Sequence, residues 1–354
     1  MGNCCKKKNA IYISNKVPLK NPEEKKITLN DFEKLKIIGR GSFGNVYLVR
    51  YIKTNRFYAM KVLFKSIIKQ REEEEHTISE RLLMAKLNHP LIVKMHFCFQ
   101  DPKNLYFIMD LIQGGDLLYH LRLHNRFDDE KTRFYIAELI LILEFLHDNN
   151  VIYRDIKPEN ILIDKTGHIK LVDFGLSKIF EKNEKMYTIC GTSFYLAPEL
   201  IIKKGYNCDA DWWSLGCLVY ELLSGIPPFK MEGNDINTLN FDQPLKMDNC
   251  FSEEAKDLIN KLLVKDPKQR LGAGDGGVEK LKQHPYFKSI NWDDLKELKV
   301  TPPFIPEIRD DTDLKYIARS IEENNISNSV DSDNNIDNYV NFSFYEESQS
   351  DIQN

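Results

Sequence analysis

The stretch VIYRDIKPENILIDKTGHIKLVDFGLSK, which runs from Val151 to Lys178, decides the fold of this chain. Within it, two short apolar runs at 161–163 and 169–172 flank the turn formers at 164–167. This pattern predicts a β-hairpin, because such residues between short strands favour a tight turn. A hairpin brings the chain back to the end at which it started. The residues just before the first run and just after the second should therefore lie close together.

Four polar side chains stand at that end of the hairpin. Asp155 and Lys157 precede the first strand, Asn160 adjoins it, and Asp173 follows the second. Asn160 and Asp173 supply two oxygen ligands of the kind that Mg²⁺ prefers. A carboxylate base, a cation aimed at phosphate and two metal-binding oxygens are the groups that phosphoryl transfer needs.

The same residues resemble the catalytic and metal-binding loops of protein kinases. Tyr153 stands where His is usual in the first motif, and a Tyr there is typical of the AGC group of Ser/Thr kinases. The resemblance implies that Asp155 is the base that orients the substrate hydroxyl and that Lys157 contacts the γ-phosphate of ATP. It also implies that Asn160 and Asp173 bind Mg²⁺, so ATP and Mg²⁺ are expected as substrate and cofactor.

An α+β fold with two lobes follows from the resemblance, with a small β-rich lobe before a larger helical one. We expect a basic N-terminal segment at residues 1–31 and a protein kinase domain at residues 32–287. Residues 288–354 are expected to form the C-terminal extension that AGC kinases carry.

The larger lobe should contain helices over 132–147 and 209–224. The second pattern is apolar on nearly all sides, which predicts a buried helix. Glu199 closes the loop that follows the metal motif, and by resemblance it pairs with Arg270. Without the resemblance, both would be ordinary surface charges.

Composition places the chain among water-soluble globular proteins, with 354 residues, 42% of them hydrophobic and 29% charged. No apolar run approaches the roughly 20 residues of a membrane span, and there is no signal-peptide core, so we expect a cytoplasmic location. Seven cysteines without paired metal spacing predict reduced thiols. Cys190 is either a reactive thiol in a mobile loop or a buried inert one, and we favour the second.

Charge is unevenly distributed along the chain, whose formal net charge is −4. Residues 1–30 carry seven Lys and two Glu, a net charge of +5. Residues 305–354 carry three basic and twelve acidic residues, a net charge of −9, which leaves the body between them neutral. A nucleic-acid-binding protein would favour a basic body, so we predict no nucleic-acid partner. We expect a monomer.

The first residues, MGNCCKKK, predict contact with a membrane. Gly2 is a candidate for myristoylation, although Lys6 stands where the usual motif has Ser or Thr. Cys4 and Cys5 are candidates for palmitoylation. One acyl chain binds only marginally, so a second lipid or the basic cluster 6–8 would be needed. We expect peripheral attachment to the cytoplasmic face, and the alternative is an unmodified, disordered start.

A glycine-rich loop joins two predicted strands, 32–38 and 46–51. A lone GxGxxG is weak, but its place between strands favours a kinase phosphate-covering loop over a dinucleotide fold. Glycine lets the backbone approach phosphate without an obstructing Cβ. By resemblance, these residues line the ATP site: Ile38, Gly39, Arg40, Gly41, Ser42, Phe43, Gly44, Asn45 and Val46.

A third predicted strand, 57–63, carries Ala59 and Lys61, which match the ATP-binding strand of kinases. Lys61 alone would be an ordinary solvated residue. Glu80, however, lies 19 residues further on, in a helix predicted over 72–88. The resemblance implies that Lys61 and Glu80 form the ion pair that activity requires.

The apolar run 105–109 predicts a buried strand that leads into the hinge between the lobes. By resemblance, the hinge binds adenine through its backbone. Met109 is then the gatekeeper, and Asp110 and Ile112 belong to the ATP site.

The loop that contains TICGT, at residues 188–192, is regulatory by the same resemblance. AGC kinases are phosphorylated at the position of Thr188, and an upstream phosphoinositide-dependent-kinase-like activator is an expected partner. A phosphate there adds about −1.5 to −2 charge and would order the loop by gathering cations. The candidate cations are Arg154, Lys178 and His76. A lone His is usually structural, but for this one we favour a switch role.

Three acids, Asp116, Glu159 and Glu221, match positions where AGC kinases hold the Arg side chains of substrates. Carboxylates bind Arg bidentately, which gives direction as well as charge. The alternative is that these acids are idle, as many exposed acids are. We expect protein substrates with Arg upstream of the target hydroxyl.

The C-terminal extension contains NFSF at residues 341–344, which resembles the hydrophobic motif of AGC kinases. By resemblance, its two Phe side chains fill a pocket beside the helix of Glu80, and phosphorylated Ser343 meets Lys69 or Arg71. That contact would couple the tail to the active site. The alternative is a disordered tail whose aromatics are accidental.

Two other functions would fit this fold, a catalytically inactive scaffold and a nucleotide-binding switch. The presence of Lys61, Asp155, Asn160 and Asp173 argues against the scaffold. ATP binding without transfer would distinguish the switch. We predict an ATP- and Mg²⁺-dependent Ser/Thr kinase that looks most like the serum- and glucocorticoid-regulated and protein kinase B branches, activated by phosphorylation.

Overall fold

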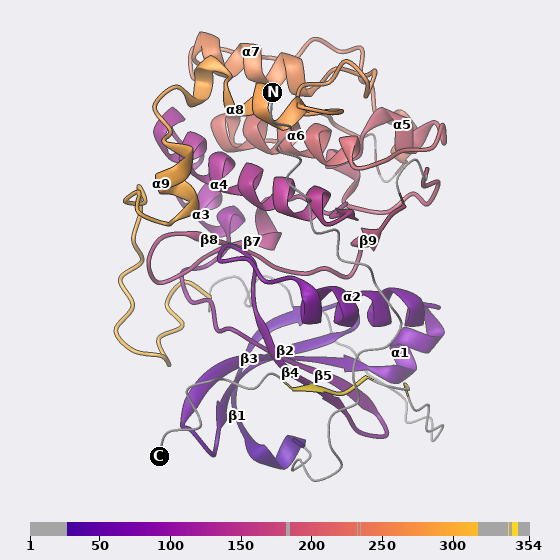
Figure 1. The fold of residues 1–354 in the computed structure, drawn as a ribbon, viewed down its shortest axis with the longest axis vertical. Coiled ribbons are helices and arrows are strands. Elements are labelled where there is room, and N and C mark those ends of the chain that lie inside the picture. The colour runs from indigo at the N-terminus through magenta and orange to yellow at the C-terminus, as the bar shows by residue number, and fades with distance from the viewer. Residues whose placement is uncertain are drawn as a thin grey trace, which may run out of the picture.

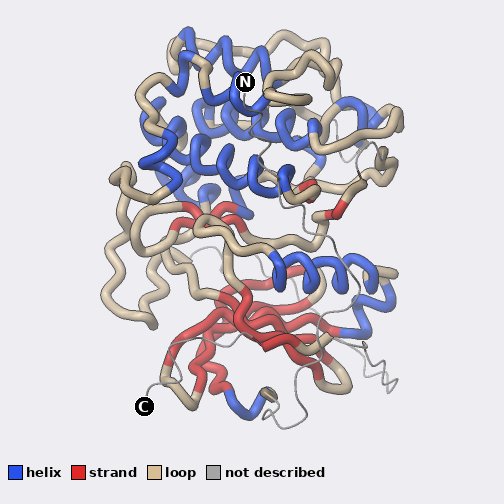
Figure 2. Tube along the Cα trace, viewed as in Figure 1, coloured by secondary structure: helices blue, strands red, loops and turns tan. Residues whose placement is uncertain are grey.

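The computed structural model describes residues 27–181, 185–231, 233, 235–317, 339 and 342–345. These residues form two lobes, a smaller one built on a β-sheet and a larger one that is mostly helical (Figure 1 and Figure 2). The predicted α+β, two-lobed fold class is confirmed. Gly2, Cys4 and Cys5 lie outside the described residues. Among the helices that are described, none has the length and apolar character to cross a membrane.

An antiparallel sheet with the strand order β1-β2-β3-β5-β4-β10 forms the small lobe. Its strands are β1 (Phe32–Gly41), β2 (Gly44–Tyr51), β3 (Arg56–Phe64), β4 (Met95–Gln100), β5 (Asn104–Met109) and β10 (Phe344–Tyr345). The helical elements of this lobe are η1 (Leu29–Asp31), α1 (Lys65–Gln70) and α2 (Glu74–Lys86). Helix α2 lies between the sheet and the large lobe (Figure 1). The strands predicted from the sequence are present and slightly longer than expected.

The turn between β1 and β2 requires glycine at one position. The strands pair down to Gly41 opposite Gly44, which leaves Ser42 and Phe43 as the turn. A Cβ at Gly44 would lie 1.8 Å from the carbonyl oxygen of Val62 in β3. Any side chain there would push β2 away from β3 and displace the turn at Ser42 and Phe43.

The large lobe is built around two long helices. Its helices are α3 (Leu117–His124), α4 (Asp129–Asp148), α5 (Pro198–Ile201), α6 (Asp209–Ser224), α7 (Glu253–Leu262), α8 (Gly277–Lys282) and α9 (Trp292–Lys296), with short turns η2 (Pro158–Asn160), η3 (Ser193–Tyr195), η4 (Ile236–Thr238) and η5 (Pro285–Phe287). Two small antiparallel ladders pair β6 (Val151–Ile152) with β9 (Lys178–Ile179) and β7 (Ile161–Ile163) with β8 (Ile169–Leu171). The second ladder is the predicted hairpin.

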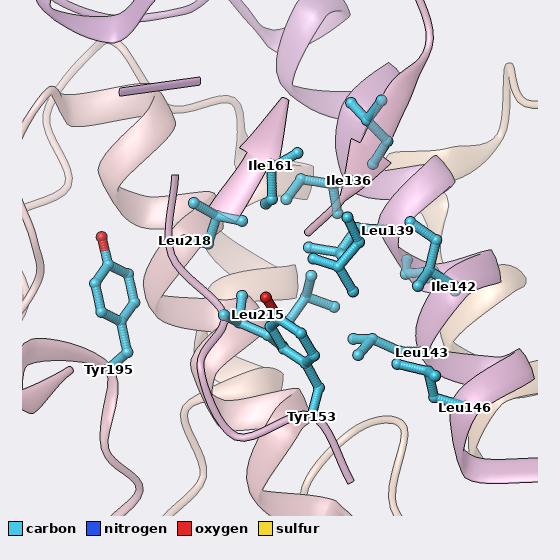
Figure 3. Close-up of a cluster of buried hydrophobic side chains, with 14 of the residues drawn as sticks. Ile136, Leu139, Ile142, Leu143, Leu146, Tyr153, Ile161, Tyr195, Leu215 and Leu218 are labelled. Carbon is cyan, nitrogen blue, oxygen red and sulfur yellow. The ribbon is translucent and has the colours of Figure 1, made fainter. Parts of the chain in front are cut away.

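Helix α6 is the buried centre of this lobe, with the bounds that the sequence predicted. Figure 3 shows Leu215 and Leu218 of α6 directed toward Leu139 and Leu143 of α4. Burial of apolar side chains on every face explains why no polar stripe is present. The helix ends where Gly225 adopts a left-handed conformation with φ of 86°, which favours glycine.

Two predicted helices differ in their bounds. The helix predicted over 72–88 is wrong at both ends, because α2 spans only Glu74–Lys86. Glu72 has φ of 56°, a left-handed conformation that separates α1 from α2. Helix α4 instead begins earlier than predicted, because the carboxylate of Asp128 accepts the N–H of Lys131 and caps it.

Candidate active site

A cavity of about 320 Å³ lies between the lobes and collects residues that the sequence placed in separate motifs. Its lining includes these predicted site residues: Gly41, Ser42, Phe43, Gly44, Asn45, Val46, Lys61, Glu80, Asp155, Lys157 and Asp173. This one cavity is therefore lined by the glycine-rich turn, by strand β3, by helix α2 and by two loops of the large lobe.

Lys61 forms two ion pairs in this cavity. Its Nζ lies 2.7 Å from Oε1 of Glu80 and 3.1 Å from Oδ1 of Asp173. Burial acts to lower the pKa of Lys61, but the charges of Asp173 and Glu80 hold it above its ordinary value. Burial raises the pKa of Glu80, whereas the Lys61 charge lowers the pKa of Asp173. The predicted Lys61–Glu80 pair is confirmed, and Lys61 is a full cation at neutral pH.

Asp155 is buried and held by three donors from its surroundings. Nζ of Lys157 lies 2.7 Å from its Oδ2, and Nδ2 of Asn160 donates to the same oxygen at 2.8 Å. The hydroxyl of Thr192 donates to Oδ1 at 3.0 Å. Lys157 also donates to the Thr192 oxygen at 3.2 Å. These contacts fix the orientation of the carboxylate, so that a free lone pair can face the cavity.

Thr192 was not assigned a role from the sequence, although it belongs to TICGT. It lies 37 residues from Asp155 along the chain, so no local spacing connects them. Asp211 was missed for the same reason. It is buried in α6, and its carboxylate accepts the backbone N–H groups of Tyr153 at 3.0 Å and Arg154 at 2.9 Å. The one available signal was an acid next to the apolar run of α6, a signal that Asp211 shares with Asp209 and Glu221 of the same helix.

The loop after β8 brings Asp173 next to Asn160. The N–H of Val172 donates to the carbonyl oxygen of Asn160 at 3.0 Å, and Asp173 has φ of 59°. A left-handed conformation is uncommon at non-glycine residues, and strained residues of this kind are enriched at functional sites. The amide nitrogen of Asn160 is directed to Asp155, which leaves its amide oxygen as a ligand.

This donor set fits Mg²⁺. Mg²⁺ typically uses one or two carboxylates together with phosphate oxygens and water, rather than a protein cage. Asp173 and Asn160 supply two such oxygens. Among the described residues, there is no group of three or more His, Cys, Asp and Glu side chains that could hold a metal ion.

The hinge residues lie apart from this cavity. The side chain of Asp110 accepts the N–H of Lys94 and lies 2.7 Å from Nε2 of His96. Asp110 and Ile112 line a second cavity of about 410 Å³ at the hinge. Five further predicted ATP-site residues are absent from the lining of both of these cavities: Ile38, Gly39, Arg40, Ala59 and Met109.

Thr188 is exposed, and the hydroxyl of Tyr206 connects its backbone to Arg154 of the catalytic loop. Its carbonyl oxygen accepts the Tyr206 hydroxyl at 2.8 Å, and Arg154 donates to that same hydroxyl oxygen at 3.3 Å. Of the other two candidate cations, His76 pairs with Glu73 and Lys178 lies in β9.

Two further predictions concern the same segment. Arg270 and Glu199 form a buried bidentate pair at 2.8 and 3.0 Å, so that predicted pair is confirmed. Burial raises the pKa of the half-buried Cys190 thiol. A raised pKa disfavours the reactive thiolate, as the inert alternative requires.

The three acids predicted to bind Arg are electrostatically coupled. Burial raises the pKa of Asp116 to about 6, and the Glu159 charge contributes. Burial, with the Glu159 charge, also raises the pKa of Glu221, whose carboxylate accepts the hydroxyl of Tyr195. Asp116 additionally caps α3 by accepting the N–H of Tyr119 at 2.7 Å. Glu159 alone among the three is exposed.

The end of the tail packs on the small lobe. Phe342 is buried against Phe107, with ring centroids 5.4 Å apart, and β10 pairs with β4. Arg81 of α2 donates to the carbonyl oxygens of Phe342 and Ser343 at 3.1 Å each. Arg81 is therefore the cation on the Ser343 backbone. Of the two cations predicted to meet phosphorylated Ser343, Lys69 lies in α1 and Arg71 lies over the Phe43 ring at 5.1 Å, and this contact stays a prediction.

Comparisons with known proteins agree with this geometry. The protein kinase domain family matches residues 32–287. The serine/threonine-protein kinase Gad8 of Schizosaccharomyces pombe is 46% identical over 284 residues, which cover 80% of this chain and 50% of Gad8. Protein kinase 3 of Dictyostelium discoideum is 46% identical over 297 residues, 81% of this chain and 32% of that protein.

The kinase Sgk1 of Xenopus tropicalis is 44% identical over 321 residues, 88% of this chain and 75% of Sgk1. The chain thus spans half the length of Gad8 and a third of Protein kinase 3, but most of Sgk1. Together, the matched domain and these relatives show that the chain belongs to the protein kinase family and confirm its resemblance to the AGC serine/threonine kinases.

Proposed function

We propose that the chain is an ATP- and Mg²⁺-dependent serine/threonine protein kinase that transfers the γ-phosphoryl group of ATP to a protein hydroxyl. The observation that carries this proposal is the setting of Asp155. Its carboxylate is fixed by Lys157, Asn160 and Thr192 at one side of the cavity whose other side holds Lys61 and its ion pairs.

In the proposed mechanism, Asp155 accepts a hydrogen bond from the substrate hydroxyl and takes its proton as the hydroxyl attacks. Lys157, beside it, neutralises charge on the transferred phosphoryl group. Lys61 binds the other phosphates, and Glu80 keeps it extended into the cavity. The glycine-rich turn covers the phosphates and excludes water.

Asn160 and Asp173 are the residues that would hold Mg²⁺. When bound, the ion neutralises negative charge on the phosphates. Support comes from the β7–β8 hairpin, after which the N–H of Val172, next to Asp173 in the chain, donates to the carbonyl oxygen of Asn160. The adenine would bind the backbone of the hinge at residues 110–112.

We infer that the substrates carry Arg upstream of the target residue. Support comes from the proximity of Asp116, Glu159 and Glu221, since the Glu159 charge, together with burial, raises the pKa of the other two. Exposed Glu159 is the acid that a guanidinium would reach first.

A radiolabelled-ATP assay on an Arg-rich peptide library tests the proposed function and the substrate class together. Transfer to Ser and Thr peptides, greatest where Arg precedes the acceptor, is the expected result. Binding of ATP without any transfer would overturn the kinase proposal in favour of a nucleotide-binding switch. Transfer that is indifferent to Arg would overturn only the substrate class.

We further propose activation by phosphorylation of Thr188 and Ser343. Support comes from the exposure of Thr188 beside the Tyr206–Arg154 contact, and from the contact of Arg81 with the Ser343 backbone. An upstream phosphoinositide-dependent-kinase-like activator is the proposed source of the Thr188 phosphate.

Thr188→Ala is expected to lower kcat/KM by about 5- to 150-fold, the usual range of an allosteric coupling. The physical reason is that the loop loses the charge that would order it against Arg154. The wild-type chain and the variant would each be phosphorylated with a cell extract, and kcat/KM would then be measured by steady-state kinetics. Thr301→Ala, at another exposed threonine, is the matched control. Full turnover by Thr188→Ala would remove this phosphorylation from the mechanism.

We propose peripheral attachment to the cytoplasmic face of a membrane through acylation of Gly2, Cys4 and Cys5, aided by the basic cluster 6–8. Two lipids, or one with a polybasic cluster, are needed for stable binding. Gly2→Ala combined with Cys4→Ser and Cys5→Ser should move the protein from the membrane to the soluble fraction of a cell lysate. Retention of that triple variant on the membrane would contradict the proposal.

A further inference from the structure

A buried carboxylate of helix α4 holds the β7–β8 hairpin to the large lobe. Glu138 is fully buried, and its Oε1 lies 2.5 Å from Nδ1 of His168, just before β8. Its Oε2 accepts the backbone N–H of Ile169, the first residue of β8, at 2.9 Å. We call these two hydrogen bonds the α4–hairpin clamp. Glu138 lies 30 and 31 positions from its two partners, so the clamp exists only in the folded protein.

The hairpin carries the two proposed Mg²⁺ ligands but is short. Each of its strands has three residues, and an isolated two-stranded hairpin of that size is marginally stable at best. Asn160 adjoins the beginning of β7, and Asp173 follows the end of β8. The hairpin lies at the side of the large lobe that faces the small lobe (Figure 1). The groups that hold the hairpin therefore also set the positions of both ligands.

Strand β8 is held at both of its ends. At its last residue, Leu171 donates to the carbonyl oxygen of Leu91 and accepts the N–H of Val93, both from the segment between α2 and β4. At its first residue, the clamp ties Ile169 to α4. Helix α4 packs on α6, the buried centre of the large lobe (Figure 3). Loss of the clamp would leave the Leu171 bonds in place, so β8 would follow the small lobe more closely than the large one.

The clamp supplies direction as well as buried volume. Burial raises the pKa of Glu138, and the hydrogen bonds from His168 and Ile169 oppose this rise. Apolar side chains could fill the space of such a buried pair, often without loss of stability. They could not supply an acceptor that fixes the N–H of Ile169 at one place and angle. The contact therefore specifies where β8 lies on α4, in addition to filling the core.

We propose that Glu138 is a positioning residue for the binding of Mg²⁺ with nucleotide, which keeps Asp173 in place beside Asn160 by fixing β8 to helix α4. The proposal rests on the proposed role of Asn160 and Asp173 as Mg²⁺ ligands. Glu138 is absent from the lining of the cavity, so it acts through the hairpin. Loss of the clamp should therefore weaken the binding of Mg·ADP more than the binding of ADP alone.

Four variants of the full chain separate position from stability. Glu138→Leu removes both acceptors and leaves His168 and the Ile169 N–H unpaired. Glu138→Leu combined with His168→Leu replaces the buried pair by apolar side chains, which should restore much of the stability but not the acceptor. Glu138→Gln keeps both bonds, because its amide oxygen accepts from Ile169 and its amide nitrogen donates to a neutral His168 ring. Glu144→Leu, the matched control on the same helix, breaks an ion pair with Lys282 of α8 instead.

Calorimetry would measure the dissociation constants of Mg·ADP and of ADP with EDTA, and urea unfolding would measure stability. Glu138→Leu should weaken Mg·ADP binding about 3- to 10-fold, the size expected for the loss of one hydrogen bond, and leave the binding of ADP alone nearly unchanged. The double variant should keep the whole of this loss while its urea midpoint returns toward that of the wild type. Glu138→Gln and Glu144→Leu should bind Mg·ADP as the wild type does. If Glu138→Leu does not fold, the double variant decides.

Recovery of Mg·ADP affinity together with stability in the double variant would overturn the proposal, because Glu138 would then act on stability alone. Equal weakening of ADP binding with and without Mg²⁺ would overturn it as well, because the effect would not concern the metal ligands. A loss in Glu138→Gln as large as in Glu138→Leu would assign the effect to charge and exclude positioning. Failure of the wild-type chain to bind Mg·ADP more tightly than ADP is a different result, which would overturn the proposed Mg²⁺ site itself.

Discussion

Asp155→Asn is expected to lower kcat by about 10²- to 10⁴-fold, the usual contribution of a positioned general base. The amide keeps the shape of the carboxylate and can still accept from Thr192, but it cannot take a proton. Nucleotide binding should be nearly unchanged, because Asp155 faces the acceptor hydroxyl rather than the phosphates. Steady-state kinetics with radiolabelled ATP, together with an Mg·ADP titration, would separate the two effects.

The same substitution at Asp275, an exposed carboxylate in the large lobe, is the control and should leave both constants within error. If Asp155→Asn retained more than a tenth of wild-type kcat, the carboxylate would not be the base. The buried bonds from Lys157 and Asn160 would then serve only to stabilise the loop.

Lys61→Met should lower kcat by about 10²- to 10³-fold, the range for removal of one charged group that stabilises a transition state. Met preserves much of the side-chain volume in β3 while it removes the cation between Glu80 and Asp173. Mg·ADP binding should also weaken, in contrast to Asp155→Asn. The two variants are therefore distinguished by the ratio of the kinetic effect to the binding effect.

Lys61→Met has a second expected consequence, which is a change in the pH dependence of stability. Burial already raises the pKa of Glu80, and the Lys61 charge that opposes this shift would be gone. A carboxyl group with a raised folded-state pKa binds its proton more tightly than in the unfolded chain. Stability is therefore present at low pH and is lost as the pH rises through the folded-state pKa.

Urea unfolding of Lys61→Met at several pH values would measure this loss. Lys53→Met, at an exposed position in the β2–β3 turn, is the control and should follow the wild-type pH profile. A Lys61→Met variant with wild-type kcat, or with a wild-type pH profile of unfolding, would mean that Glu80 and Asp173 do not depend on Lys61.

Part of this site could be predicted because its residues are close along the chain. The hairpin from 161 to 171 accounts for the approach of Asp173 to Asn160. The pairing of Lys61 with Glu80 needed a strand, a short helix and one more helix, and the resemblance to kinases supplied the partner. Helix α6 was predicted with its bounds because its apolar pattern and Gly225 are local signals.

The predictions that failed concern backbone conformation at single residues. The helix predicted over 72–88 begins only at Glu74, because Glu72 has a left-handed backbone conformation, of which its side chain gives no sign. The contact of Arg81 with the Ser343 backbone was not predicted, because Arg81 reaches it from the buried face of α2. The predicted contact of phosphorylated Ser343 with Lys69 or Arg71 stays a prediction.

The sequence by itself determined the acid, the nearby cation and the oxygen ligands of the 151–178 stretch, because short-range spacing and side-chain chemistry specify these, and its resemblance to protein kinases supplied the class of fold and the partner of Lys61. Only the tertiary structure decided which distant groups complete them: Thr192 on Asp155, Asp211 under the backbone of Arg154, and Glu138 on the β7–β8 hairpin. The physical reason is that such contacts form when packing brings together segments that are tens of residues apart. A hydrogen bond of this kind has no periodicity in the chain, and its partners are fixed by the burial of other residues around them.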